Sequence, residues 1–182
     1  MQTTVVPSSD FRIEVERESG ESISSCYQCG KCTAGCPAAL DMDGGPRWLL
    51  RAVQLGMRDE ALNSATIWMC LFCAACQARC PAGIDIPKVL ETVRHLSLKE
   101  NRPPASKEVA LFQRLFLGQV AGMGRVHELT LGGTYNLRSG HLMSNVGLVP
   151  RMLARRKLSL LPHRKGARWF KRLLSGERKA RD

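Results

Sequence analysis

One pattern of cysteines occurs twice in this chain of 182 residues. Both copies read C-x2-C-x2-C-x3-C-P, and the second copy begins 44 residues after the first. All eight cysteines of the chain lie in the two copies: Cys26, Cys29, Cys32, Cys36, Cys70, Cys73, Cys76 and Cys80. A fold that serves these thiols must bend the backbone tightly around each copy. The pattern therefore constrains the fold more than the overall composition does.

Each copy has the spacing of a ligand run for a [4Fe-4S] cluster. Two residues between cysteines let the backbone turn around one corner of the cube, with the intervening amide N–H groups directed at sulfur. Pro37 and Pro81 remove a hydrogen-bond donor and fix φ, which ends each ligand loop. The sequence therefore predicts two [4Fe-4S] clusters as cofactors.

In bacterial-type ferredoxins the fourth cysteine of a run usually ligates the cluster of the other run. On that pattern, one cluster takes Cys26, Cys29, Cys32 and Cys80, and the other takes Cys70, Cys73, Cys76 and Cys36. No residue is predicted to be catalytic.

Three other interpretations of the cysteines are weaker. A disulfide framework requires an oxidising compartment, but the N-terminus has neither a basic segment nor an apolar segment that would direct export. Zinc would explain two C-x2-C pairs, but it leaves the third cysteine and the repeated C-P ending without a reason. Reduced structural cysteines would not need such regular spacing. Thiolate ligands also imply a reducing compartment, so we expect a cytoplasmic protein.

The positive charge of the chain is concentrated at its C-terminal end. Residues 151–182 contain twelve Lys or Arg and two acidic residues, whereas residues 1–150 are nearly neutral. Trp169, Phe170 and Leu173 would share one side of a short helix there. Such a segment suits docking to a partner or to a membrane surface better than reading a nucleic-acid groove, and a solvated tail is the plainer alternative. No apolar run is long enough to span a membrane.

The remaining pattern is mainly helical. Residues 11–15 alternate like a short N-terminal strand, and residues 1–10 resemble a disordered end. Helices are expected from Pro46 to about Gly56, from Asp85 to about residue 100, and from Ser106 to about Ala121. A short helix is expected before Cys26, a loop-rich segment at 122–136, and another short helix at 150–161. The resulting domains are a lead-in (1–20), a two-cluster domain (21–101), an extension (102–149) and a basic docking segment (150–182).

The two runs differ in their surroundings. Tyr27, Gln28 and Lys31 make the first run polar, whereas Leu71 and Phe72 make the second more apolar. Different exposure would give the clusters different reduction potentials. The chain also lacks a dinucleotide fingerprint and a phosphate-binding loop, and its four histidines are scattered. We therefore expect electron transfer without a catalytic site of its own.

The segments CYQCGKCTAGCPAALDMD and WMCLFCAACQARCPAGIDIPKVLETVR resemble the C-type iron–sulfur subunit of heterodisulfide reductase and its bacterial relatives. The lead-in FRIEVERESG extends the likeness, as do GRVHEL and RRKLSLLP more weakly. The resemblance implies an α-helical ferredoxin fold with two [4Fe-4S] clusters on the eight cysteines, and a cytoplasmic location. It also implies that the chain relays electrons between the A-type subunit, which contains flavin, and the B-type subunit, whose CCG domains reduce a disulfide.

The absence of cysteines after Cys80 distinguishes this chain from relatives that continue into CCG domains of their own, such as glycolate oxidase subunits. Two alternatives remain open. One is a free-standing helical ferredoxin, and the other is an iron–sulfur regulator that binds nucleic acid through its basic tail. No nucleic-acid module accompanies the tail, so no nucleic-acid partner is expected.

Overall fold

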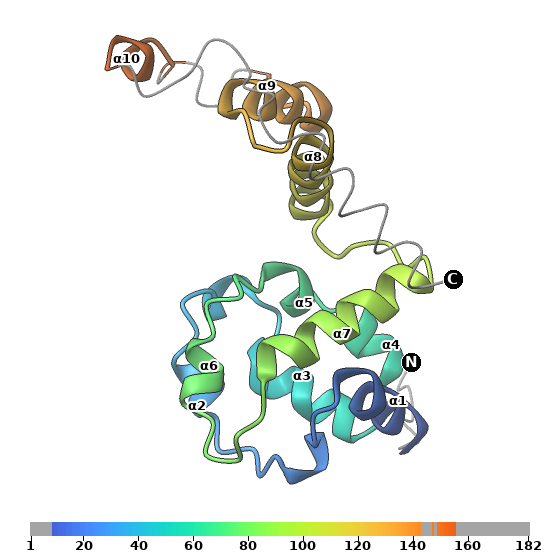
Figure 1. Cartoon of the computed structure of the whole chain (residues 1–182). Helices are drawn as coiled ribbons and strands as arrows, with labels where there is room; N and C mark the ends of the chain where they lie inside the picture. Colours follow the sequence, from blue (N-terminus) through green and yellow to red (C-terminus); the bar gives the residue numbers. More distant parts are fainter. Residues whose placement is uncertain (1–8, 143–146, 148, 156–182) are drawn as a thin grey trace. The chain divides into compact units, whose positions relative to one another are not determined.

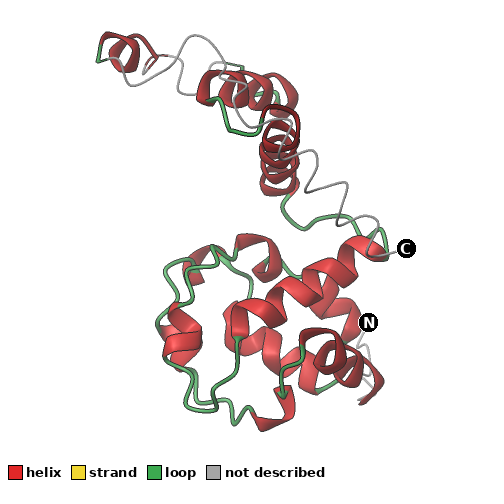
Figure 2. Cartoon of the chain, viewed as in Figure 1, coloured by secondary structure: helices red, strands yellow, loops and turns green. Residues whose placement is uncertain are grey.

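The computed structural model describes residues 9–142, 147 and 149–155, and the part of the chain that it describes contains helices and turns but no strand (Figures 1 and 2). The chain divides into two compact units, Met1–Lys107 and Glu108–Asp182. Each unit is described by itself. The mainly helical class predicted from the sequence is confirmed.

The N-terminal strand predicted at residues 11–15 is wrong, because these residues lie in helix α1 (Ser9–Ser19). Phe11, Val15 and Ser19 are its buried residues, which is the four-residue spacing of one helix face, whereas Ile13 is 50% exposed. An ion pair of 2.8 Å between Arg12 and Glu16 joins successive turns. Five residues are too few to distinguish the two-residue period of a strand from the 3.6-residue period of a helix. The whole segment Ser9–Ser19 shows the helical period.

The first unit pairs short helices that follow the cysteine loops with longer helices that pack behind them. Its further elements are η1 (Ile23–Ser25), α2 (Lys31–Ala34), η2 (Ala39–Asp41), α3 (Gly45–Gln54), α4 (Arg58–Leu62), α5 (Thr66–Met69), α6 (Ala75–Ala78) and α7 (Ile86–Lys99). Helix α2 packs against α3, α6 packs against α7, and the two short helices also contact each other. The two long helices, α3 and α7, also contact each other. The two halves of the unit therefore repeat one arrangement around the cysteines.

The predicted helix starts in this unit are confirmed. Pro46 stands in the first turn of α3, where its missing N–H costs nothing. Asp85 caps α7 by accepting a hydrogen bond of 3.2 Å from the backbone N–H of Lys88, and Pro87 follows in the first turn. The short helix expected before Cys26 is η1.

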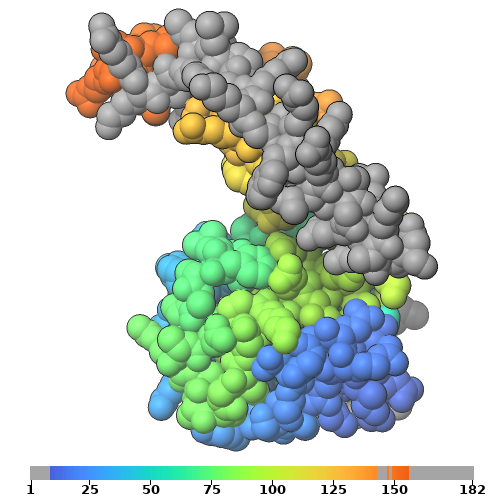
Figure 3. Space-filling view, in the orientation of Figure 1, coloured from blue at the N-terminus to red at the C-terminus, as the bar shows by residue number. Residues whose placement is uncertain are grey.

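The core of the first unit is aliphatic and lies behind the cysteine loops. Its fully buried large side chains are Val15, Ile23, Leu49, Leu50, Val53, Leu62, Ile67, Ile86, Val89, Leu90, Val93 and Leu96. Most of them come from α3 and α7, the two long helices. Figure 3 shows α1, in blue, on the surface of this unit beside α7, against which it packs.

The second unit contains α8 (Lys107–Met123, which begins at the boundary), α9 (Glu128–Ser139) and α10 (Val149–Ala154). The helix expected from Ser106 is α8, but the loop expected through residue 136 is wrong. The side chain of His127 caps α9 by accepting from the backbone N–H of Thr130, and Leu131 is buried. The cap and the burial of Leu131 outweigh the cost of Gly132 and Gly133 in the helix, which is about 1 kcal/mol each relative to alanine.

Several sequence predictions concern residues outside those described. These are the first eight residues of the disordered end predicted at 1–10, and the basic segment beyond residue 155 with its amphipathic helix around Trp169. Ser9 and Asp10, which belong to that predicted end, lie in α1 instead. Within the described residues, no helix has both the length and the apolar character needed to cross a bilayer.

Candidate iron–sulfur centres

Each cysteine run follows one short helix and continues into another. Helix η1 ends at Ser25, directly before Cys26, and α5 ends at Met69, directly before Cys70. The third cysteine of each run lies inside the next short helix, Cys32 in α2 and Cys76 in α6. The loops between them are short because the cysteine spacing leaves only two residues for each turn.

The two loops share an unusual backbone conformation. Gln28 and Phe72, at equivalent positions, have φ values of 59° and 52°. Gly30 and Ala74, also equivalent, have φ values of 82° and 58°. Alternation of left-handed residues with ordinary ones turns successive amide N–H groups toward a common centre, an arrangement typical of anion and iron–sulfur sites. The loops thus repeat each other although their side chains differ.

The eight cysteines line two cavities, four to each. One cavity, with about 280 Å³ of empty space, is lined by Cys26, Cys29, Cys32 and Cys80. The other, with about 350 Å³, is lined by Cys36, Cys70, Cys73 and Cys76. Each cavity therefore collects three cysteines of one run and the fourth cysteine of the other. We call them the first and the second cavity.

Both sets of cysteines show the same pattern of exposure. The second cysteine of each run, Cys29 or Cys73, is exposed, the third is buried, and the other two are intermediate. The difference in exposure expected between the two sites is therefore not seen at the described thiols. The contrast lies in the surroundings, because Leu71 of the second run is 68% exposed and lines the second cavity.

Burial raises the pKa of the Cys32, Cys70 and Cys76 thiols, that of Cys76 to about 11. Neighbouring thiols add to the effect, among them Cys36 beside Cys70 and Cys32 beside Cys76. These two neighbours come from the opposite cysteine run. Because thiolates are the metal-binding form, a positively charged iron centre is the kind of group that would offset this cost.

Two glutamine side chains hold the first loop in place. Nε2 of Gln54, on α3, donates to the carbonyls of Ile23 at 3.0 Å and Cys26 at 2.8 Å. The amide of Gln28 donates to Sγ of Cys26 at 3.5 Å. The role of Gln54 leaves no mark in the sequence, because glutamines on helix surfaces are common and its two bonds reach residues that are 31 and 28 positions away.

Asp43 organises the segment that leads into the second run. Its carboxylate accepts from Oγ of Ser64 at 2.8 Å, from Oγ1 of Thr66 at 2.5 Å and from the backbone N–H of Ala65 at 2.8 Å. Partial burial by itself would raise the pKa of Asp43, but these hydrogen bonds outweigh it and the pKa is lowered. Helix α5, which leads into Cys70, begins at Thr66.

The thiols line the walls of two cavities and do not gather around a single metal position. No three Cys, His, Asp or Glu side chains among residues 9–142 and 149–155 come close enough together to hold a single metal ion. A tetrahedral zinc site needs all its sulfurs about 2.3 Å from the metal. Thiols spread around a cavity instead fit a polynuclear cluster, whose ligands bind separate iron atoms.

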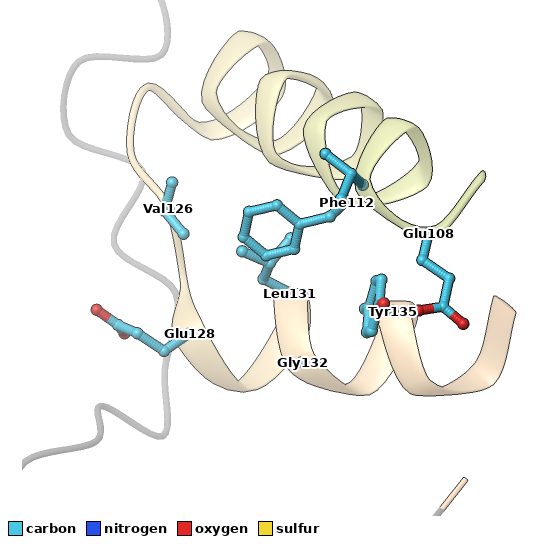
Figure 4. A pocket seen from close by; sticks show the side chains of 8 residues that line it. Glu108, Phe112, Val126, Glu128, Leu131, Gly132 and Tyr135 are labelled. Atoms are coloured by element: carbon cyan, nitrogen blue, oxygen red, sulfur yellow. The ribbon is translucent and has the colours of Figure 1, made fainter. Parts of the chain in front are cut away.

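A separate groove lies between α8 and α9 of the second unit (Figure 4). Phe112 and Tyr135 line the groove, and their rings meet edge to face with centroids 6.0 Å apart. The carboxylates of Glu108 and Glu128 lie at its borders. The groove contains no cysteine, so it is not one of the thiol sites.

Comparison with known proteins agrees with this geometry. Residues 16–85 match the model of the 4Fe-4S dicluster domain. Over 98 residues the chain is 38% identical to the C-type iron–sulfur subunit of the CoB–CoM heterodisulfide reductase of Methanopyrus kandleri, covering 53% of this chain and 51% of that protein. Over 110 residues it is 36% identical to the C-type subunit numbered 2 of the same enzyme from Methanocaldococcus jannaschii, covering 60% and 59%.

A third relative is the C-type subunit of the H(2):CoB-CoM heterodisulfide,ferredoxin reductase of Methanothermobacter marburgensis. It is 34% identical over 104 residues, which cover 57% of this chain and 56% of that protein. The chain thus spans a little more than half the length of the curated relatives it matches.

Proposed function

We propose that this chain is an electron-relay subunit of a heterodisulfide reductase-like complex, because residues 16–85 are a 4Fe-4S dicluster domain and the relatives are subunits of that reductase. A dicluster domain holds two [4Fe-4S] clusters. The observation that carries the proposal is the division of the eight cysteines between two cavities, four thiols to each. Four thiolates are the full ligand set of one such cluster.

We assign the ligands by cavity. The first cluster is held by Cys26, Cys29, Cys32 and Cys80, and the second by Cys70, Cys73, Cys76 and Cys36. Support comes from the lining of the two cavities and from the contact between α2 and α6, which brings the two runs together. When bound, the clusters supply one-electron storage.

The protein residues have three tasks in this proposal. The cysteines bind the iron atoms, the left-handed loop residues direct amide N–H groups at the sulfurs, and the aliphatic core on α3 and α7 keeps water from the inner side. Crossed ligation interlocks the two runs, so each loop stabilises both sites. Because α2 contacts α6, the two sites are neighbours, and an electron can step from one to the other.

We infer that the partners are the A-type subunit, a flavoprotein, together with the B-type subunit, which has CCG domains, and that the chain itself is not catalytic. The relatives are C subunits of heterodisulfide reductases, and a subunit of that kind works with further subunits, which supports this assignment. A cytoplasmic location follows from the need for reduced thiolates. Neither nucleic acid nor a membrane-spanning segment has a part in the proposal.

Serine variants of the fourth cysteines test the ligand assignment. Cys36→Ser should perturb the cluster built on Cys70, Cys73 and Cys76, while Cys80→Ser should perturb the other. Cys32→Ser and Cys76→Ser, which change the third ligand of each run, identify the spectrum of each cluster. The measurement is the electron paramagnetic resonance spectrum of the reduced protein. If Cys36→Ser altered the same signal as Cys32→Ser, ligation would be local and the crossed assignment would be wrong.

Anaerobic affinity purification at native expression level tests the relay. Recovery of a flavoprotein and a CCG-domain chain together with this one, with iron and flavin quantified, is the expected result. Recovery of this chain alone, with both clusters present, would instead identify a free-standing helical ferredoxin.

A further inference from the structure

The rim of the first cavity carries a group of exposed cations. Lys31, at the start of α2, and Arg47, on α3, both line this cavity, and Arg51 follows Arg47 one helical turn later. All three side chains are exposed. None of them forms an ion pair with another described residue. We call these three residues the basic rim.

Hydrogen bonds connect the helices that carry the basic rim to each other and to the first loop. The backbone N–H of Arg47 donates to Oγ1 of Thr33 at 2.9 Å, which fixes the start of α3 against α2. Arg51 reaches Oε1 of Gln54 at 3.4 Å, and the same oxygen accepts from Gln28, which lines the cavity, at 3.5 Å.

Few carboxylates oppose this charge locally. Between residues 22 and 57 the acidic residues are Asp41 and Asp43, and the carboxylate of Asp43 is engaged by residues 64–66. The second cavity differs in degree, because apolar Leu71 lines it and the cation near its Cys70, Arg94, lies with its guanidinium over the ring of Phe72.

We propose that the basic rim is the docking surface through which the first cluster exchanges electrons with an acidic protein partner. The inference deepens the proposed function and rests on it. Exposed Cys29 lies in the wall of the same cavity, so a partner seated on the rim would stand next to a cluster ligand. Unpaired surface cations beside a redox centre attract an acidic partner and raise its association rate, an effect that salt weakens.

The test uses the full chain with both clusters reduced. Its oxidation by plastocyanin, an acidic copper protein, is followed by stopped flow at low and high ionic strength. One electron leaves the reduced cluster and converts Cu(II) to Cu(I), and no atom or proton is transferred. The double variant Arg47→Glu/Arg51→Glu should slow the reaction at least fivefold at low salt and abolish most of its salt dependence.

A matched control separates the basic rim from net charge. Arg17→Glu/Lys99→Glu makes the same change in charge at two exposed cations without ion pairs to described residues, and it should alter the rate less than twofold. Cytochrome c, a basic acceptor, should not be slowed by the rim variant. Equal slowing by both double variants, or by neither, would overturn the inference.

Cluster content distinguishes failure of this inference from failure of the proposed function. Iron content and the spectrum of the reduced protein should match the wild type in both double variants, and Arg47→Gln/Arg51→Gln replaces the rim variant if the charge reversal prevents folding. A wild-type chain that binds no [4Fe-4S] cluster would overturn the proposed function and this inference together. Intact clusters with rates insensitive to the rim would overturn the inference alone.

Discussion

Arg79 lies directly against Gly35, the residue at the equivalent position of the other cysteine run. A Cβ atom at residue 35 would stand 2.7 Å from Cζ of Arg79, so the guanidinium occupies the space of the missing side chain. Gly35 precedes Cys36 and Arg79 precedes Cys80. The cation therefore lies where the two runs cross, next to one proposed ligand of each cluster.

Removal of this cation should lower both reduction potentials. Reduction adds negative charge to a cluster, and a nearby positive charge favours that state. We expect Arg79→Gln to lower each midpoint potential by roughly 20 mV, the equivalent of about 0.5 kcal/mol for an exposed charge. The measurement is a redox titration monitored by electron paramagnetic resonance, with Arg17→Gln as the control. Unchanged potentials in the Arg79 variant would contradict the role.

Exchanging glycine and alanine at the equivalent left-handed positions 30 and 74 should change stability in opposite directions. Gly30→Ala introduces into the first run the residue that the second run already has, at φ 82°, and should destabilise the protein by about 1 kcal/mol. A Cβ there would meet only the side chain of Arg47, with Cδ at 3.6 Å, so the cost is conformational.

The reciprocal change, Ala74→Gly, relieves strain at φ 58°, but glycine also raises the entropy of the unfolded chain and so offsets most of that gain. The variant should therefore be neutral or slightly stabilising. The apparent Tm, read from loss of visible cluster absorbance, tests both variants. A stabilising Gly30→Ala would show that the loop is not held in this conformation.

Asp43→Asn should weaken the segment that leads into the second cysteine run. The amide loses the charge and one of the two acceptor oxygens that residues 64–66 use, at a cost of about 1 kcal/mol at a partly exposed site. The pKa of Asp43 is lowered in the folded state, so its contribution is complete above the unfolded value near 3.8 and is lost only as pH falls through the lower folded value.

The difference in apparent Tm between wild type and Asp43→Asn should therefore stay constant from pH 8 to about pH 5. Asp41→Asn is the control, because Asp41 is exposed and nearby. A difference that shrinks between pH 7 and pH 5 would mean that the carboxyl titrates above its usual range.

Arg58 joins three helices of the first unit, and its loss should loosen them. On α4, its guanidinium pairs with Glu14 of α1 and Glu100 at the end of α7, and it lies 5.0 Å from the ring centroid of Phe11. Arg58→Met should lower stability by about 1–2 kcal/mol, because it removes the cation that pairs with Glu14 and leaves Glu100 with Arg102 alone. Arg17→Met, at an exposed position, is the matched control. A double-mutant cycle with Glu14→Gln that shows no coupling would refute this role.

Local chemistry made part of the structure predictable. The helix starts at Pro46 and Asp85 depend on the first helical turn alone, so the sequence was sufficient to locate them. Short windows were insufficient where two periods fit equally well, as at residues 11–15. They also failed where a cap and a buried leucine outweigh glycines, as in α9.

The spacing of the cysteines was enough to identify eight candidate iron ligands in two runs, because that spacing is a local property of the chain. The grouping of Cys36 with Cys70, and of Cys80 with Cys26, was expected only by analogy with ferredoxins, whereas the folded chain places each pair in one cavity. That pairing depends on α2 packing against α6, and the roles of Gln54 and Asp43 likewise depend on contacts between segments more than twenty residues apart. Such contacts form when helices pack their apolar faces, and no local spacing encodes them.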